Sequence, residues 1–344
     1  MRERIFYAIT SGIHPTLSIS ELKGILESEN ITYNIITAYD QLVLFKAENK
    51  RINRILERAG LIKEVGIVIK ITSSDVNSLI RDIKDIDWSF IDGEFKVEYK
   101  RLRGHGKHIN EREVVLKVAD TIIRTTNQRV NLVKPKYLVK LIATNGVIIM
   151  GISLGKLDTK QFLFRNPANR PYFHPGALPP HIARVFVNLS RPRYNCPYLD
   201  PFCGTGGFLI ESCIMGYYSI GCDIDPRMVE GSIINLKYYG LSNFEVVQAD
   251  ATKLPFTNMF CSIGTDPPYG RSTSTKGRRL FDLIEGFLHS AASVLKRNSF
   301  ICFAAPHVVD ISDVISDCGM KVLEKHFMRV HGSLTRIIWL VYMP

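Results

Sequence analysis

The chain has 344 residues, of which 44 are Lys or Arg and 33 are Asp or Glu, so its formal net charge is +11. This length allows two or three domains, and 46% hydrophobic with 22% charged residues excludes a wholly disordered chain. No apolar run approaches the roughly 18 residues of a membrane-spanning helix, and no signal-peptide pattern is present, so we expect a cytoplasmic protein.

In residues 1–165, short strands alternate with helices in an α+β pattern. Ser18 or Ser20 can cap the first helix and Asp75 a later one, and Asn145-Gly146 predicts a hairpin turn. The predicted strands cover residues 5–10, 31–38, 41–47, 65–72, 95–99, 130–133, 137–144 and 147–153, and the predicted helices cover 19–28, 50–59, 76–84 and 111–124.

Residues 166–180 contain five of the 16 prolines and predict a linker. Beyond it, strands alternate with helices, which predicts an α/β fold with a mostly parallel sheet and a ligand at the carboxyl ends of its strands. The predicted strands cover residues 194–199, 218–223, 244–249, 261–265, 300–304, 321–330 and 335–342, and the predicted helices cover 207–215, 227–239, 279–295 and 308–318.

The positive charge is concentrated in the first half. Residues 1–165 carry 27 basic and 19 acidic side chains, a net of +8, whereas residues 166–344 carry 17 and 14, a net of +3. This division favours a polyanion-binding module joined to a catalytic one, although a merely soluble basic surface would show the same charge.

The seven cysteines all lie in the second half, and none forms a C-x-x-C pair, so the sequence predicts neither a zinc ribbon nor a redox motif. We interpret them as small buried side chains in a reducing compartment. His105 and His108 lie close together but lack thiolates or carboxylates in register, so no metal site is predicted.

A glycine-rich turn follows the first predicted strand of the second half and opens a helix. Gly204, Gly206 and Gly207 let the backbone approach a ligand, and the helix N-terminus offers free N–H groups to it. The turn matches neither a P-loop nor a dinucleotide-binding fingerprint.

Four consecutive strands of this half end in a carboxylate. Asp200 begins the glycine-rich turn, Asp223 can accept both hydroxyls of a ribose, and Asp250 can accept an exocyclic adenine amine. Asp266 begins an Asp-Pro-Pro-Tyr quartet. Any one of these acids could simply cap a helix, but the four together favour a nucleoside-like cofactor.

This series resembles the class I S-adenosylmethionine-dependent methyltransferases, and the quartet resembles their amino-methylating branch. There the Asp266 carboxylate and the Pro267 carbonyl would accept both N–H groups of an exocyclic amine, leaving its lone pair aimed at the sulfonium methyl. Pro268 would stiffen the loop, and Tyr269 would stack on a flipped-out base. The resemblance therefore implies a Rossmann-like fold and catalytic residues Asp266, Pro267, Pro268 and Tyr269.

Residues 170–179, 200–211, 223–231, 266–272 and 331–336 resemble the tRNA guanine-N2 methyltransferases that act at guanosine 10. The resemblance implies S-adenosylmethionine as cofactor and transfer of one or two methyl groups. It also implies cofactor-binding roles for Phe173, His174, Pro175, Gly176, Asp200, Pro201, Cys203, Gly204, Thr205, Gly206, Asp223, Ile224, Asp250, Ala251 and Asp266.

Residues 95–101, 103–105, 113–124 and 130–135 resemble the tRNA-binding THUMP module. The implied domains are a ferredoxin-like subdomain at 1–48, THUMP at 49–155, a linker at 156–180 and the methyltransferase domain at 181–344. The basic residues that we expect to contact RNA are Lys100, Arg101, Arg103, Lys107, Lys134, Lys136, Arg271, Arg278 and Arg279, with Lys140 flanking the same region.

Three alternatives stay open at this point: methylation of guanosine 6, methylation of adenine in DNA, and an inactive tRNA-binding chaperone. A THUMP-containing thiolation enzyme is not favoured, because the sequence has no S-G-G-x-D-S stretch. By analogy with compact relatives, we expect a monomer that needs no activating subunit.

Overall fold

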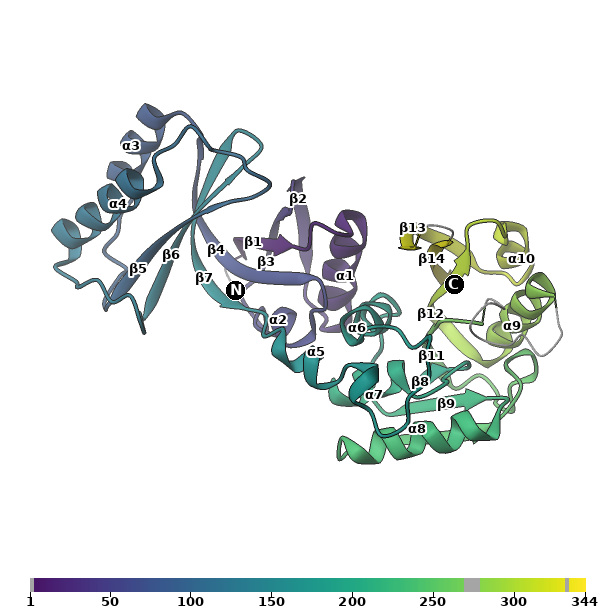
Figure 1. Cartoon of the computed structure of the whole chain (residues 1–344). Helices are drawn as coiled ribbons and strands as arrows, with labels where there is room; N and C mark the ends of the chain where they lie inside the picture. Colours follow the sequence, from purple (N-terminus) through teal and green to yellow (C-terminus); the bar gives the residue numbers. More distant parts are fainter. Residues whose placement is uncertain (1–2, 269–278, 332–333) are drawn as a thin grey trace. The chain divides into compact units, whose positions relative to one another are not determined.

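The computed structural model describes residues 3–268, 279–331 and 334–344 (Figure 1). It divides into two compact units. The first unit comprises Met1–Ile19, Ile31–Glu57 and Ile62–Leu157, and the second comprises Ser20–Asn30, Arg58–Leu61 and Asp158–Pro344. Within the described ranges, no helix combines the length and the apolar composition needed to cross a membrane.

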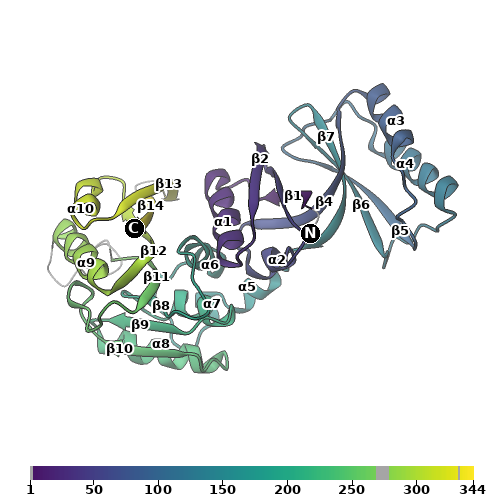
Figure 2. The ribbon, with the colours of Figure 1, turned by 180° about the vertical axis from the view of Figure 1, so that it is seen from behind.

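The first unit is built on a seven-stranded sheet in the order β2-β3-β1-β4-β7-β6-β5 (Figure 2). Its central strand β4 pairs antiparallel with β1 on one side and with β7 on the other, so one sheet joins the two predicted N-terminal subdomains. The strands are β1 Glu3–Thr10, β2 Tyr33–Tyr39, β3 Leu42–Glu48, β4 Ile62–Ser73, β5 Phe95–Arg101, β6 Tyr137–Thr144 and β7 Val147–Lys156.

Helices α3 (Val76–Asp85) and α4 (Glu111–Thr126) cover one face of this sheet. Val114, Val118 and Ile122 of α4 are buried against alternate residues of β5, β6 and β7. The predicted cap is confirmed, because the Asp75 carboxylate accepts the Ser78 N–H at 2.8 Å. The shorter helix α2 (Arg54–Arg58) and the first turns of α1 (Pro15–Ser28) complete the unit.

The second unit contains a seven-stranded sheet in the order β10-β9-β8-β11-β12-β14-β13. The five strands β10, β9, β8, β11 and β12 run parallel to one another. The hairpin of β13 and β14 adds two strands beside β12, where β14 pairs antiparallel with both β12 and β13. This is the predicted Rossmann-like arrangement. The strands are β8 Tyr198–Asp200, β9 Ser219–Asp223, β10 Phe244–Gln248, β11 Phe260–Thr265, β12 Leu295–Pro306, β13 Lys321–His331 and β14 Leu334–Met343.

Helices lie on both faces of this sheet (Figures 1 and 2). Buried apolar residues of α9, such as Ile284, Phe287 and Leu288, pack in one core with Ile263 and Phe303 of the central strands. The helices are α5 Lys160–Phe164, α6 Pro180–Leu189, α7 Gly207–Ile214, α8 Pro226–Tyr238, α9 Leu280–Val294 and α10 Ser312–Asp317, with 3₁₀ turns η1 Pro167–Asn169 and η2 Ala251–Lys253.

The segment expected as a linker packs into the second unit through a buried ionic cluster. Arg165 and Arg184 both donate to the carboxylate of Glu211 on α7, each with one contact of 2.7 Å. Both guanidinium groups also lie over the Phe162 ring of α5. These contacts hold α5 and α6 against α7.

Several local predictions are wrong. Residues 130–133 form no strand but a single bridge at Val130, and Val133 is 94% exposed. Helix α1 begins at Pro15, so Ser18 is no cap, and its hydroxyl donates to the His14 carbonyl one turn earlier. Helices α2 and α10 are shorter than predicted, and α5 and α6 were not predicted.

The cysteine interpretation needs one correction. Cys196, just before β8, and Cys261 on β11 form a disulfide. Because β8 and β11 are neighbours in the sheet, the fold brings these residues together across 65 positions of sequence. The other five cysteines are free, and all of them except Cys318 are buried, as expected.

Candidate active site

The candidate site lies where the strand order of the second sheet reverses, between β8 and β11. At such a switch point the loops that follow the two strands diverge to opposite faces and leave a crevice. Asp200 and Asp223 end β8 and β9, and Asp250 and Asp266 follow β10 and β11. The fold therefore brings the four predicted carboxylates to one edge of the sheet.

The glycine-rich turn wraps tightly between β8 and α7. The Cys203 N–H donates to the Cys222 carbonyl of β9, and the Gly206 N–H donates to the Cys203 carbonyl, both at 2.8 Å. Gly204 and Gly206 have φ of 49° and 82°, which disfavours other residues. A Cβ on Gly206 would lie 2.6 Å from Ser232 Oγ, so glycine lets the turn pack closely against α8, whereas a Cβ on Gly204 would meet no atom within 4 Å.

Asp200 is fully buried beneath this turn. Its Oδ1 accepts the Thr265 hydroxyl at 2.7 Å and the Phe202 N–H at 3.2 Å. Its Oδ2 has no hydrogen-bond partner among the described residues. Burial raises the pKa of Asp200 to about 8, the Thr265 and Phe202 hydrogen bonds oppose this rise, and the carboxylates of Asp223 and Asp266 add to it. Because Asp200 is fully buried, a cation in the crevice could act on this carboxyl only through its charge, not by direct contact.

Asp223 and Asp250 also bind backbone groups. Asp223 accepts the Gly204 N–H at 3.0 Å and the Asp225 N–H at 2.9 Å, so it ties the glycine-rich turn to the end of β9. Asp250 caps η2 by accepting the Thr252 N–H at 2.9 Å. These two acids therefore bind nearby backbone N–H groups, as capping residues do, and they also lie at the same edge of the sheet as Asp200 and Asp266.

Asp266 follows β11 and is held by a cation from another strand. Arg336 of β14 donates Nη1–H to Asp266 Oδ2 at 2.7 Å. Pro267 is buried and Pro268 is half-buried. Among the remaining predicted residues, Tyr269, Arg271 and Arg278 lie outside the described residues.

The Phe-His-Pro-Gly segment starts directly beside the glycine-rich turn. The Asn235 amide of α8 donates to the carbonyls of Tyr172 and Thr205 and accepts the Tyr172 N–H, at 2.9–3.0 Å. The Tyr172 ring covers Gly231, where a Cβ would lie 2.2 Å away. Phe173 itself is 56% exposed. Asn235 thereby joins two predicted cofactor-binding segments.

The remaining predicted cofactor residues surround these groups. Pro201, Cys203, Thr205 and Ala251 are buried, His174 is half-buried, and Pro175, Gly176 and Ile224 are exposed. The sequence alone assigns no role to Asn235, Thr265 or Arg336, because their partners lie 30 to 70 residues away along the chain.

Comparison with known proteins decides the family. The family described as an RMKL-like methyltransferase domain matches residues 167–338. The chain is 36% identical to tRNA (guanine(10)-N2)-dimethyltransferase of Methanothermobacter thermautotrophicus over 326 residues, which cover 94% of this chain and 95% of the relative. The chain belongs to this methyltransferase family.

Two further proteins are more distant. The chain is 23% identical to tRNA (guanine(6)-N2)-methyltransferase of Archaeoglobus fulgidus over 324 residues, covering 83% of this chain and 78% of that relative. The crystal structure of TrmN from Thermus thermophilus shares the fold with a TM-score of 0.54 at 20% identity, covering 98% of this chain and all of that one. The enzyme is an S-adenosylmethionine-dependent methyltransferase, and the open space beside Gly204, where a Cβ would meet no atom within 4 Å, fits a cofactor that approaches the backbone closely.

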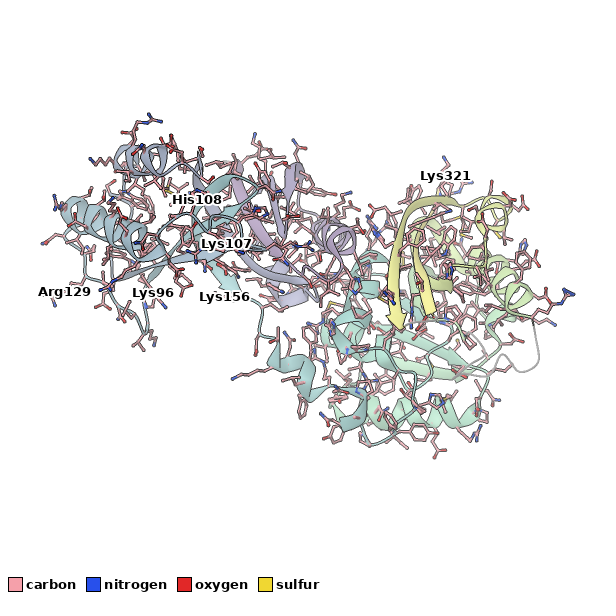
Figure 3. The ribbon with its side chains drawn as sticks, turned by 45° about the horizontal axis from the view of Figure 1, so that its top comes forward. Lys96, Lys107, His108, Arg129, Lys156 and Lys321 are labelled. Carbon is pink, nitrogen blue, oxygen red and sulfur yellow. A yellow bond between two sulfur atoms is a disulfide. The ribbon has the colours of Figure 1, made fainter. Side chains whose placement is uncertain are left out.

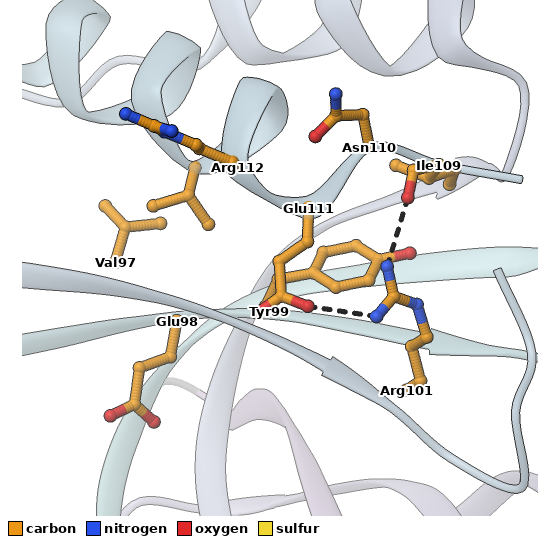
Figure 4. A pocket seen from close by; sticks show the side chains of 9 residues that line it. Val97, Glu98, Tyr99, Arg101, Ile109, Asn110, Glu111 and Arg112 are labelled. Atoms are coloured by element: carbon orange, nitrogen blue, oxygen red, sulfur yellow. Dashed lines mark hydrogen bonds and ion pairs between the residues drawn. The ribbon is translucent and has the colours of Figure 1, made fainter. Parts of the chain in front are cut away.

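The basic residues of the methyltransferase's first unit differ in how far they are neutralised. Arg101 donates to Glu111 at 3.0 Å and to the Ile109 carbonyl at 3.1 Å, beside a pocket of about 750 Å³ (Figure 4). Arg103 donates to the Gly12 carbonyl, and Lys136 pairs with Asp92 at 2.6 Å. Burial lowers the pKa of the half-buried Lys100.

Lys140 is buried and is not a surface contact. It pairs with Glu98 at 2.8 Å and with Glu64 at 3.6 Å. Lys107 and Lys134 are exposed, and Lys96, Lys107, Arg129 and Lys156 are labelled on the first unit in Figure 3. In the second unit Arg279 is exposed and lies 3.9 Å from Asp282.

His105 and His108 have separate partners. His105 Nε2 lies 3.0 Å from the Asp40 carboxylate, and His108 Nε2 lies 2.9 Å from the Ser74 carbonyl. Within the part of the chain that the structure describes, no group of three or more His, Cys, Asp or Glu side chains is arranged to hold a metal ion.

Proposed function

We propose that this protein transfers one or two methyl groups from S-adenosylmethionine to the exocyclic N2 of guanosine 10 in tRNA. The observation that carries the proposal is the position of Asp266 and Pro267 at the end of β11, beside the glycine-rich turn that follows β8. An amine acceptor and a cofactor cradle thus share one edge of the sheet.

S-adenosylmethionine supplies an electrophilic methyl group on a sulfonium. Gly204 and Gly206 would approach the cofactor through their backbone, Asp223 would accept its ribose hydroxyls, and Asp250 with Ala251 would hold its adenine. Asp200 is fully buried beneath the turn and would act on the positive charge of the cofactor through its electric field, not by direct contact.

The guanine amine is a poor nucleophile because its lone pair is delocalised into the ring. The Asp266 carboxylate and the Pro267 carbonyl would accept its two N–H groups, weaken its conjugation with the ring and leave its lone pair aimed at the sulfonium methyl. The N2–C bond would form as the S–C bond of the cofactor broke, and the positive charge would pass from sulfur to N2. The amine then loses a proton to solvent, so no general base is needed.

The first unit would act as the THUMP-type tRNA-binding module. Its exposed cations, including Lys107 and Lys134, would contact phosphates and position the RNA without reading bases. We further propose that the enzyme works in the cytoplasm as a monomer without an activating subunit.

Guanosine 6 is the principal alternative target. Position 10 is supported by the higher identity and fuller coverage of the guanine-10 relative compared with the guanine-6 relative. The deciding experiment uses unmodified tRNA transcripts and labelled cofactor, followed by localisation of the product nucleoside. Adenosine at position 10 should abolish labelling, and adenosine at position 6 should not. Failure to label any tRNA would instead favour an inactive tRNA-binding protein.

The catalytic assignment is tested with Asp266→Ala. We expect turnover to fall at least about 100-fold, because the amine loses its main acceptor, while the Kd for S-adenosylmethionine changes less than about threefold. Turnover is measured with labelled cofactor and binding by calorimetry. Asp282→Ala, at an exposed position of α9, is the matched control and should behave like the wild type. Retained turnover in Asp266→Ala would contradict the mechanism.

A further inference from the structure

We propose that Arg336 is a positioning residue that fixes the Asp266 carboxylate in its ionised, amine-accepting form. The proposal rests on the proposed function, because it assigns a partner to the acid that receives the amine. Arg336 belongs to the C-terminal hairpin, 70 residues beyond Asp266.

The contact between the two side chains is short and shielded. Arg336 Nη1 lies 2.7 Å from Asp266 Oδ2, and the two side chains are only 8% and 14% exposed. A charge-assisted hydrogen bond of this length is stronger when water is largely excluded. The pair therefore holds the carboxylate plane more firmly than a surface ion pair would.

The sheet explains why the arginine must come from β14. Strand β12 lies between β11 and β14, and Arg336 pairs in register with Pro306, the last residue of β12. This register places Arg336 at the carboxyl edge of β11, where Asp266 begins. The antiparallel strand thus delivers a long cationic side chain across β12 to the catalytic edge.

Several acids lie close to Asp266 at this edge. The carboxylates of Asp223 and Asp266 both act on the buried Asp200, so three acids influence one another at the ends of β8, β9 and β11. Clustered carboxylates favour protonation of one another. Arg336 on β14 opposes this, and His307, which follows β12, is exposed and bonded to the Thr335 carbonyl.

Ionisation of Asp266 matters for the chemistry. A protonated carboxyl group would present a donor toward an amine whose N–H groups need acceptors. An arginine-paired carboxylate is also a weaker base than an unpaired one, which suits an acid that orients the amine and leaves its proton to solvent. Arg336 would thus act on the rate of transfer through Asp266 and would have little effect on cofactor binding.

The test compares Arg336→Met, Arg336→Lys and the control Arg329→Met, which changes an exposed arginine of the neighbouring strand β13. We expect Arg336→Met to lower kcat about 10- to 100-fold, with the KM for tRNA and the Kd for S-adenosylmethionine within about threefold of the wild type. Its activity should recover at higher pH. Arg336→Lys should restore the wild-type pH profile at a reduced kcat, because lysine keeps the charge but not the planar geometry.

A second measurement does not depend on turnover. The titration of the Asp266 carboxyl is followed by ¹³C NMR of the ligand-free protein, with its resonance assigned by its loss in Asp266→Asn. Its midpoint should rise in Arg336→Met and remain near the wild-type value in Arg336→Lys and Arg329→Met.

The outcomes separate the two proposals. Wild-type protein that labels no tRNA contradicts the proposed function, while the NMR titration still decides the role of Arg336. An unchanged midpoint in folded Arg336→Met, or a kcat and pH profile equal to the wild type, overturns the role of Arg336. A loss of cofactor binding that parallels the loss of kcat also overturns it, because the arginine would then be merely structural.

Discussion

At the scale of single residues, we expect Asp200 to couple cofactor binding to the release of a proton. Burial raises its pKa to about 8, so below that pH the neutral form predominates in the ligand-free site. A cationic cofactor stabilises the ionised form. Binding of S-adenosylmethionine should therefore release a proton, and its affinity should increase with pH up to about pH 8.

Calorimetry at pH 6 and pH 8 measures this effect. We expect binding of S-adenosylmethionine to be at least about tenfold tighter at pH 8, with proton release visible as a dependence of the heat on the buffer. Asp200→Asn should bind weakly at both values and lose the pH dependence. Asp282→Asn should keep the wild-type behaviour. An affinity of the wild type that is independent of pH would contradict the assignment of Asp200.

The Asp200 carboxyl also makes folding depend on pH, but in the opposite direction: the ligand-free protein should lose stability as the pH rises. Because the native pKa of about 8 exceeds the unfolded value of 3.8, the ligand-free native state binds this proton more tightly than the unfolded chain does. The contribution to stability is complete below pH 3.8 and is lost as the pH rises to about 8. In thermal unfolding without cofactor, Asp200→Asn should exceed the wild-type Tm by a few degrees at pH 8 and by less at pH 5. An equal difference at both values would argue against this shift.

At the scale of elements, Asn235 makes α8 a connector. Its side chain holds Tyr172 of the segment before α6 and Thr205 of the glycine-rich turn. Because Asn235 is fully buried, its removal would leave three backbone groups without partners, each costing about 1–3 kcal/mol. The two segments that we propose to bind the cofactor would then no longer be held at a fixed separation.

We expect Asn235→Ala to weaken S-adenosylmethionine binding at least about tenfold and to lower the Tm. Calorimetry and thermal unfolding measure the two effects. Lys237→Ala, an exposed substitution in the same helix, is the control and should leave both unchanged. If Asn235→Ala lowered the Tm yet bound the cofactor normally, its role would be confined to packing.

The elements show what local sequence patterns can predict. The sequence predicts most strands because their apolar residues alternate or run together, as in β6 and β7 around the Asn145-Gly146 turn. The apolar residues at 130–133 have the same local pattern but no strand partner beyond Val130. The sequence does not predict helices α5 and α6, because the prolines between them favour a linker. Their packing depends on buried ion pairs of Arg165 and Arg184 with Glu211, which no local pattern indicates.

The candidate site also has a part that the sequence predicts and a part that it does not. Its four acids follow strands, and parallel strands end at one edge, so their proximity could be predicted. The partners of those acids could not, since Arg336 and Thr265 reach their carboxylates only through the order and register of the sheet. The Cys196–Cys261 bridge has the same origin.

At the scale of the whole molecule, the +11 charge should govern RNA affinity. Each phosphate neutralised by a cation lowers the slope of log K against log salt by about 0.7–0.9. The affinity for tRNA should therefore fall steeply with salt, whereas that for S-adenosylmethionine should not. Lys107→Ala should make this negative slope shallower by about one unit.

Filter binding or fluorescence across a salt series measures these slopes. Arg124→Gln is the control, because Arg124 already pairs with Asp120 on the exposed face of α4. A slope for Lys107→Ala equal to that of the wild type would remove Lys107 from the set of RNA contacts.

The shared sheet of the first unit limits how the chain can be divided. Strand β4 hydrogen-bonds to β1 along one edge and to β7 along the other. A truncated protein beginning at residue 49 would lose β1, β2 and β3 and would present the bare edge of a 12-residue strand to solvent. Such an edge is a template for association with other chains. Shortened versions intended for RNA-binding work should therefore retain residues 1–48.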